Sequence, residues 1–339
     1  MSRPRIAVTI MPLDNRRDVL VSTAVAAERR GFEGFFLPET WALDTTVVLA
    51  EAAVKTERIT LGTGILNVWS RSPGTLAMAA ATLASLSGGR FVLGLGASTA
   101  QLTEGLHDVP YRTPTARLRR AITQVRALLR GDRIPLAEAT GARALKLNLP
   151  PGPDVPIYLA ALADESVRAA GELADAWMPF LYPWSQLAAG SALLREGLAR
   201  RPDGTPVPLI CPSVPTVVAE DPVAARDGAA WFVAFYLTTM GPLYRQSLVR
   251  QGFGKEVEAV LAANTPRQQG IVPADAEILL EQLTVFGTPA QARSRLARWH
   301  RAGAAMPILL LKPHLALKEI ELTLDAFRPM LESDTVARA

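Results

Sequence analysis

Short apolar runs alternate with amphipathic stretches along most of the chain. Eight of the apolar runs predict β-strands, at residues 6–10, 34–38, 59–66, 91–96, 156–161, 176–181, 209–218 and 307–311. These runs are apolar on both faces rather than in alternation, which is typical of parallel strands covered by helices. The pattern therefore predicts a parallel sheet assembled from βα units.

The stretches between the strands predict helices. Residues 16–30, 75–87 and 115–130 carry apolar side chains at helical spacing, and glycines stand where the first two should end. The third also carries a stripe of arginines, which we interpret as a solvated face rather than a phosphate contact. Its members are Arg119, Arg126, Arg130 and Arg133.

Eight strands with intervening helices fit a (β/α)₈ TIM barrel of the α/β class better than a doubly wound sheet, which usually has five or six strands. Two gaps, 97–155 and 219–306, are too long for one crossover helix each. We therefore expect one domain over 1–339, with insertions after strands 4 and 7 at roughly these two places. Substrate specificity should reside in the insertions, because a minimal barrel needs only about 250 residues.

Composition narrows the functional classes. The 339 residues are 49% hydrophobic, and 36 basic against 32 acidic side chains leave a net charge of +4, too small and too dispersed to indicate nucleic-acid binding. The uncharged runs 72–89 and 228–244 contain Pro and Gly and predict buried helices rather than membrane spans; we expect the second near the barrel mouth or in a subunit contact. The single cysteine, Cys211, forbids an internal disulfide and favours a reducing, cytoplasmic setting.

Several chemistries lack their residues. The three histidines, His107, His300 and His314, are scattered, so we expect no metal site, and no Gly-x-Ser-x-Gly nucleophile elbow occurs. The glycine pairs Gly62/Gly64 and Gly94/Gly96 lack the third glycine of a dinucleotide fingerprint. Each pair lies at the C-terminal end of a predicted strand, where it marks either tight packing or a flat ligand against the backbone.

The ordered set of motifs resembles the luciferase-like monooxygenase superfamily, and most closely its coenzyme F420-dependent branch, which includes methylenetetrahydromethanopterin reductase. The resemblance covers most of the chain and is densest over 5–98. The motifs are AAERRGFEG (26–34), ERITLGTGILN (57–67), SRSP (70–73), SGGRFVLGLG (87–96), PIYLAA (156–161), AGELADA (170–176) and FGTP (286–289).

The resemblance implies a barrel that holds a flavin or deazaflavin ring at its C-terminal mouth. It implies a non-prolyl cis peptide bond at Gly64–Ile65, with Leu66 and Asn67 continuing the wall beside the ring. Gly96, Ala97 and Ser98 follow the fourth strand and are expected to contact the same ligand. The cofactor phosphate is expected at Ala160, Ala161, Leu162 and Ala163, although the carboxylates of Asp164 and Glu165 follow directly and would repel it.

The catalytic candidates come from the same comparison. F420-dependent relatives often carry an acid in strand one and Asp-His after strand two, where this chain has Thr9 and Glu39-Thr40. The histidine is therefore missing. Glu39 is the candidate for a proton donor or for an orienting contact to the cofactor, and both roles stay open. Trp41, Trp69 and His107 are candidates for lining the substrate pocket.

The leading functional hypothesis is an F420-dependent oxidoreductase that transfers a hydride between the reduced deazaflavin and a C=C, C=N or C=O group of a small substrate. An FMN-dependent monooxygenase is the alternative enzyme, and a flavin-binding protein without turnover is the alternative of another class. The resemblance also implies a homodimer. Neither a nucleic-acid nor a membrane partner is expected.

Overall fold

A ring of parallel strands forms the centre of the protein. The computed structural model describes residues 3–136, 141–149 and 154–332, and every predicted strand appears there in its predicted place. The barrel strands are β1 (Ala7–Ile10), β2 (Gly34–Leu37), β3 (Thr60–Thr63) with its extension β4 (Leu66–Asn67), β5 (Phe91–Gly96), β6 (Ile157–Leu159), β7 (Ala176–Trp177), β8 (Leu209–Ile210) continued by β9 (Ser213–Val218), and β11 (Ile308–Leu311).

The hydrogen-bond pattern closes the ring. Neighbouring strands follow the order β9, β11, β1, β2, β3, β5, β6, β7 and β8, all in parallel. The strands β8 and β9 are two parts of one segment, interrupted at Cys211 and Pro212. The Cys211 N–H still donates to the carbonyl of Trp177 at 2.8 Å across that interruption. The first and last strands of the path are thus one segment, and the predicted (β/α)₈ barrel is confirmed.

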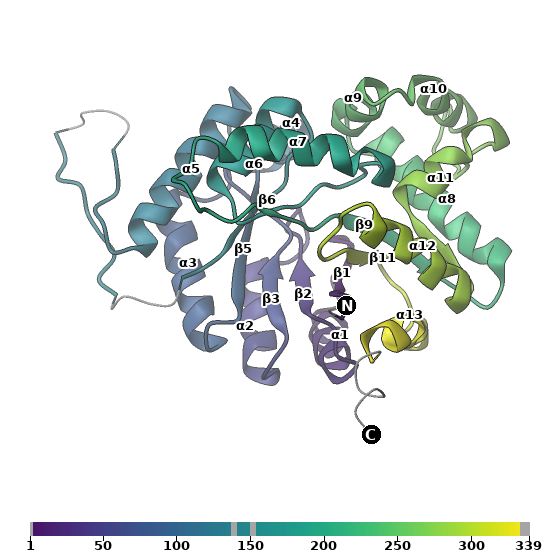
Figure 1. Cartoon of the computed structure of the whole chain (residues 1–339), viewed down its shortest axis with the longest axis horizontal. Coiled ribbons are helices and arrows are strands. Elements are labelled where there is room, and N and C mark those ends of the chain that lie inside the picture. Colours follow the sequence, from purple (N-terminus) through teal and green to yellow (C-terminus); the bar gives the residue numbers. More distant parts are fainter. Residues whose placement is uncertain (1–2, 137–140, 150–153, 333–339) are drawn as a thin grey trace.

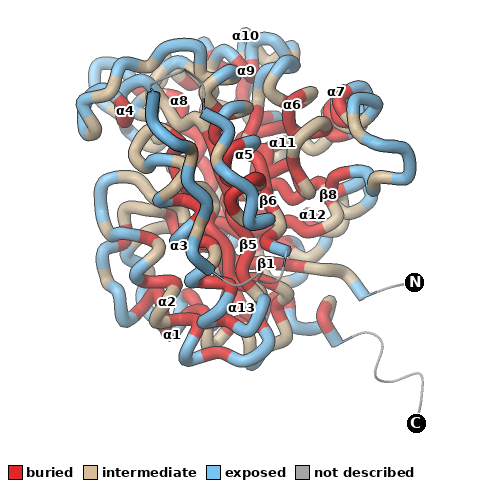
Figure 2. Tube along the Cα trace, turned by 90° about the vertical axis from the view of Figure 1, so that its left-hand side faces the viewer, coloured by how far each residue is buried: buried red, intermediate tan, exposed pale blue. Residues whose placement is uncertain are grey.

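Helices cover the outside of the barrel (Figure 1). The helices predicted at 16–30, 75–87 and 115–130 are present as α1 (Arg17–Arg29), α3 (Pro73–Leu86) and α5 (Pro114–Leu129). The buried segments, red in Figure 2, run through the middle of the molecule, and exposed ones lie outside. None of the described helices combines the length and apolar composition needed to cross a membrane. The covering helices are α1 (Arg17–Arg29), α2 (Thr45–Lys55), α3 (Pro73–Leu86), α5 (Pro114–Leu129), α6 (Asp164–Leu173), α7 (Leu187–Leu198), α12 (Pro289–Arg301) and α13 (Leu317–Leu331).

The barrel interior is filled by side chains rather than open. Phe36 and Tyr158 stack with ring centroids 6.0 Å apart, and Cys211 is a free, buried thiol beside them. Burial raises the pKa of Cys211 to about 12, so the thiol is inert, as its apolar neighbours in the sequence predict. A Cβ on Gly62 would lie 2.3 Å from the Phe36 ring. Gly62 is therefore required by packing.

The arginine stripe on and after α5 is solvated only in part. Arg119 pairs with Glu172 of α6 at 2.7 Å, and Arg126 with Asp175 at 2.8 Å just beyond α6. These two arginines tie α5 to α6. Arg130 and Arg133 are exposed, as predicted.

Both insertions lie where the long gaps predict them. The first adds α4 (Ala100–His107) before α5, and a segment after α5 that extends to one side in Figure 1. Residues 137–140 and 150–153 of this insertion lie outside the described ranges. So do residues 1–2 and 333–339 of the expected domain. The second adds α8 (Pro222–Thr239), α9 (Pro242–Arg250), α10 (Gly254–Ala263), α11 (Ile278–Leu283) and β10 (Val285–Gly287). The strand β10 pairs with the end of β9 and was not predicted.

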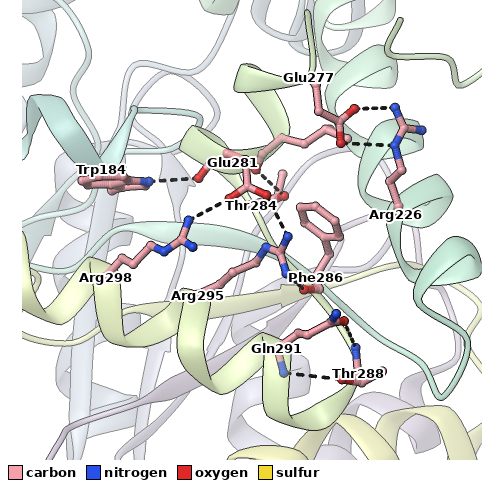
Figure 3. Close-up of polar contacts among 11 residues, drawn as sticks. Trp184, Arg226, Glu277, Glu281, Thr284, Phe286, Thr288, Gln291, Arg295 and Arg298 are labelled. Carbon is pink, nitrogen blue, oxygen red and sulfur yellow. Dashed lines mark hydrogen bonds and ion pairs between the residues drawn. The ribbon is translucent and has the colours of Figure 1, made fainter. Parts of the chain in front are cut away.

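Charged contacts fasten the second insertion to the barrel wall (Figure 3). The carboxylate of Glu281 in α11 accepts hydrogen bonds from Arg295 and Arg298 of α12, both at 2.7 Å. The backbone carbonyl of Glu281 accepts one from the Trp184 indole at 2.9 Å. Arg226 of α8 pairs with Glu277 just before α11. These contacts join α8 to the start of α11, and α11 to α12 of the barrel wall.

Candidate functional site

A cavity of about 270 Å³ opens at the C-terminal ends of the barrel strands. Its walls come from the segments after strands one to six, from β9 and β11, and from α8 and α9 of the second insertion. In (β/α)₈ enzymes this face carries the active site. We call it the mouth cavity.

The two glycine pairs divide between packing and the cavity. A Cβ on Gly94 would lie 1.9 Å from the backbone oxygen of Thr63, whose hydroxyl also bonds to both the N–H and the carbonyl of Gly94 at 2.8 Å. Gly94, like Gly62, therefore serves strand packing. Gly64 and Gly96 line the mouth cavity instead.

The third strand has the bulge that the resemblance implies. The Gly64–Ile65 peptide bond is cis, and Ile65 lines the mouth cavity. A Cβ on Gly96 would lie 3.0 Å from the Ile65 side chain. Ala97 and Ser98 continue the same wall. Small residues thus leave a smooth, mostly apolar surface between strands three and four, which suits a flat ring.

Glu39 is in the mouth cavity but is not a free acid. Its carboxylate accepts hydrogen bonds from Arg71 at 2.8 and 3.3 Å and from the Thr45 N–H at 3.3 Å. Arg71 also pairs with Asp44, the N-cap of α2, at 2.9 Å. Only 11% of the Glu39 side chain and 16% of the Arg71 side chain are exposed. Burial acts to lower the pKa of Arg71, but the hydrogen bonds to the two carboxylates outweigh it and raise the pKa.

The two threonines among the catalytic candidates also line the mouth cavity. The Thr40 hydroxyl donates to the Pro12 carbonyl at 3.2 Å, and the Thr9 hydroxyl makes only a long contact, 3.4 Å, to the Ile10 carbonyl. Trp41 lines the rim and is 51% exposed. These candidates therefore converge at one place.

Four other candidates do not line the mouth cavity. Leu66 is fully buried, and the Asn67 amide is used internally, accepting from the Trp69 N–H and donating to the Thr103 hydroxyl. The Trp69 indole donates to the Ala97 carbonyl at 3.0 Å, so it supports the wall from behind. His107 ends α4, away from the cavity lining. Leu66 and Asn67 point away from the cavity because β4 pairs with β5 immediately after the bulge.

The expected phosphate-binding segment lies at the N-terminus of α6. Ala160, Ala161, Leu162 and Ala163 all line the mouth cavity. Ala163 is the N-cap and supplies no side-chain cap, so the N–H groups of the first turn are available to an anion. Ser166 lines the cavity too. Asp164 and Glu165 occupy the same turn, so both donors and repelling charges are present there.

Sequence reasoning missed Arg71 and an aromatic wall. Phe180, Tyr236 and Tyr244 pack edge-to-face in the mouth cavity, with ring centroids 4.6 to 5.4 Å apart. Both tyrosines lie within the uncharged run 228–244, which was expected near the mouth or in a subunit contact. The first of these alternatives holds. Arg71 stands in the SRSP motif, but nothing in the sequence indicates which carboxylate it meets.

Comparisons with known proteins agree with this geometry. The profile of the luciferase-like monooxygenase family matches residues 5–306. A putative coenzyme F420-dependent oxidoreductase from Mycobacterium tuberculosis is 31% identical over 309 residues, covering 84% of this chain and 88% of the relative. A 5,10-methylenetetrahydromethanopterin reductase from Archaeoglobus fulgidus is 26% identical over 265 residues, covering 77% and 79%.

A solved structure shows the same fold. The coenzyme F420-dependent tetrahydromethanopterin reductase from Methanopyrus kandleri superposes with a TM-score of 0.78 at 20% identity. The superposition covers 98% of this chain and 100% of that one.

Proposed function

The chain belongs to the luciferase-like monooxygenase family, and from that premise we propose that it is an oxidoreductase that uses coenzyme F420 to transfer a hydride to or from a small organic substrate. The observation that carries the proposal is the 31% identity, over most of both chains, to a relative described as F420-dependent. When bound, the reduced cofactor supplies a hydride, and a proton from water or a side chain completes reduction of a C=C, C=N or C=O group.

The residues of the mouth cavity fit such a cofactor. Gly64, Ile65 and Gly96 form a smooth edge that accommodates a planar ring. The edge depends on glycine at position 96, because a Cβ there would press on the Ile65 side chain. The N–H of the N-cap residue Ala163 is bonded to Ser166 Oγ, but no side chain caps the following N–H groups of the first turn of α6, which can donate to a phosphate. We propose the ring against the bulge, in contact with Gly96–Ser98, and the phosphate at 160–163. The acidic pair at 164–165 should weaken phosphate binding rather than abolish it.

We assign Glu39 a positioning role. Its carboxylate is already engaged by Arg71 and by the Thr45 N–H, and this holds the segment 38–41 that forms one wall of the cavity. Thr9 and Thr40 then remain as hydroxyl groups facing the ligand.

Cofactor titration tests the proposal. The purified protein is titrated separately with F420 and with FMN, and binding is followed by fluorescence and by calorimetry. We expect binding of F420, and loss of it in Gly96→Leu, because the new side chain fills the ring site. Gly105→Leu is the matched control, since Gly105 is exposed on α4 with nothing near its Cβ. Tight binding of FMN without binding of F420 would instead identify the monooxygenase alternative.

We also propose that the protein acts as one domain in a homodimer within the cytoplasm. The helices α2 and α3 expose Val47, Val54 and Met78, which a second copy could cover. A mass of one chain by light scattering at micromolar concentration would contradict the dimer.

A further inference from the structure

The mouth cavity carries almost no charge. Among the described residues that line it, Glu39 is the one ionisable acid and no lysine, arginine or histidine is present. The charge of Glu39 is already matched by Arg71 at 2.8 Å. A substrate with a phosphate or carboxylate would thus lose its hydration in this cavity without gaining a cation in return.

Two phenol hydroxyls on the aromatic wall lack hydrogen-bond partners. No described group bonds to the hydroxyl of Tyr236 or Tyr244, whereas Tyr111, also in the lining, donates to the Ser98 carbonyl at 3.2 Å. Neither of the two oxygens is sealed within the protein, and both residues line the mouth cavity. Burial raises the pKa of both hydroxyls, so each stays protonated and can donate.

The aromatic wall holds these hydroxyls in place. Tyr236 and Tyr244 pack edge-to-face at 5.4 Å, and Phe180 packs against both, at 4.6 and 5.4 Å. The wall comes from the segment after β7 and from the insertion after β9, whereas the Gly64–Ile65 bulge lies between β3 and β4. In the eight-stranded ring, β3 and β9 lie on opposite sides. A substrate between a ring on the bulge and this wall would meet the two hydroxyls.

We propose that the substrate is a small, uncharged molecule with a carbonyl or similar acceptor oxygen, and that Tyr236 and Tyr244 position that oxygen by donating hydrogen bonds. The proposal rests on the proposed function, which supplies the cofactor on the opposite wall. The cavity, about 270 Å³, is small for a ligand site, which favours a small substrate beside the ring. The α6 N-terminus, where we propose the cofactor phosphate, is then taken, and the lining offers a second anion no lysine, arginine or histidine, so sugar phosphates should bind weakly as substrates.

The test uses cyclohexenone and its analogue with a carboxylate on the ring. Binding is measured by saturation-transfer NMR on the full chain, with and without F420, and turnover is measured with reduced F420. We expect binding and reduction of cyclohexenone, and at least about tenfold weaker binding of the carboxylate, because its desolvation is uncompensated.

Substitution of the two tyrosines tests their role. Tyr236→Phe and Tyr244→Phe each remove one donor, so we expect each to weaken cyclohexenone binding and raise its KM about 2- to 13-fold. The affinity for F420 should stay unchanged. The control is Tyr182→Phe, a buried tyrosine that packs on Trp177 outside the cavity and should leave the KM unaltered.

Each outcome decides the matter. Equal or tighter binding of the carboxylate, no binding of cyclohexenone, or unaltered binding and KM in both phenylalanine variants would overturn the inference while F420 binding still supports the proposed function. Failure of F420 to bind would overturn the proposed function. In that case the NMR measurement without cofactor still reports whether the tyrosines hold the carbonyl compound.

Discussion

Removing the Glu39–Arg71 pair should loosen the wall of the mouth cavity. Arg71 reaches from the segment after β4 to the segment after β2, where it holds both Glu39 and the N-cap Asp44. We consider the variants Glu39→Gln, Arg71→Met and their combination. The single changes leave a mostly buried charge with fewer partners, whereas the double variant removes both charges.

The structure sets the size of the effect. At 2.8 Å and an effective dielectric of about 20, the gross attraction between the charges is about 6 kcal/mol. Desolvation of both groups offsets most of it, and Asp44 remains as a second partner of Arg71. A coupling free energy of about 2 kcal/mol should remain. The exposed pair Arg168–Glu196 is the control, and its coupling should stay below about 1 kcal/mol.

A double-mutant cycle measures this coupling. Unfolding in urea is followed by both fluorescence and circular dichroism, and coincident curves establish that a two-state analysis applies. The dissociation constant for F420 is measured on the same four proteins. Coupling in stability below about 0.5 kcal/mol, the limit of simple additivity, would refute the view that the pair organises this wall. Unchanged F420 affinity in Glu39→Gln would remove Glu39 from cofactor binding.

Two further predictions concern stability. Gly94→Ala places a Cβ 1.9 Å from the backbone oxygen of Thr63, which cannot move without breaking the β3–β5 pairing. We therefore expect no soluble folded protein from this variant. The control Gly105→Ala has open space around the new Cβ and should express normally. Glu28 accepts three backbone N–H bonds, from Glu57, Arg58 and Ile59 at 2.6 to 2.9 Å; burial acts to raise its pKa, but these bonds outweigh it and lower the pKa. Glu28→Gln should therefore cost about 1–3 kcal/mol at pH 7. The difference from the parent protein should shrink as the pH falls below about 4.5, because Glu28 is then protonated in the unfolded parent chain, and it should vanish below the lower pKa of the folded state. A difference that is independent of pH would contradict this account of Glu28.

The order of the barrel elements could be read from the chain because it depends on local pattern. An apolar run as short as 91–96 predicts a strand buried on both faces rather than a helix. The stretch 115–130 shows its helical face through Leu118, Ile122 and Val125. Both appear as predicted, as do the gaps that hold the insertions. The short strand β10 was missed because it follows a long insertion and becomes a strand only by pairing with β9.

The mouth cavity was less predictable, since it depends on where side chains point after each strand ends. Asn67 was expected beside the ligand, but the pairing of β4 with β5 places its amide against Trp69 and Thr103. Arg119 and Arg126 of α5 were expected to be solvated because their partners, Glu172 and Asp175, lie far away in the sequence. Long-range partners of this kind leave no mark in local spacing.

The sequence by itself determined the succession of strands and helices, and hence the closed barrel, because hydrophobic periodicity is a property of neighbouring residues. Only the tertiary structure decided which glycines serve packing and which border the mouth cavity. It also brought Arg71 against Glu39, and it placed Tyr236 and Tyr244 together in the mouth cavity with no described hydrogen-bond partner for either hydroxyl. Those outcomes depend on contacts between segments that only the closing of the barrel brings together.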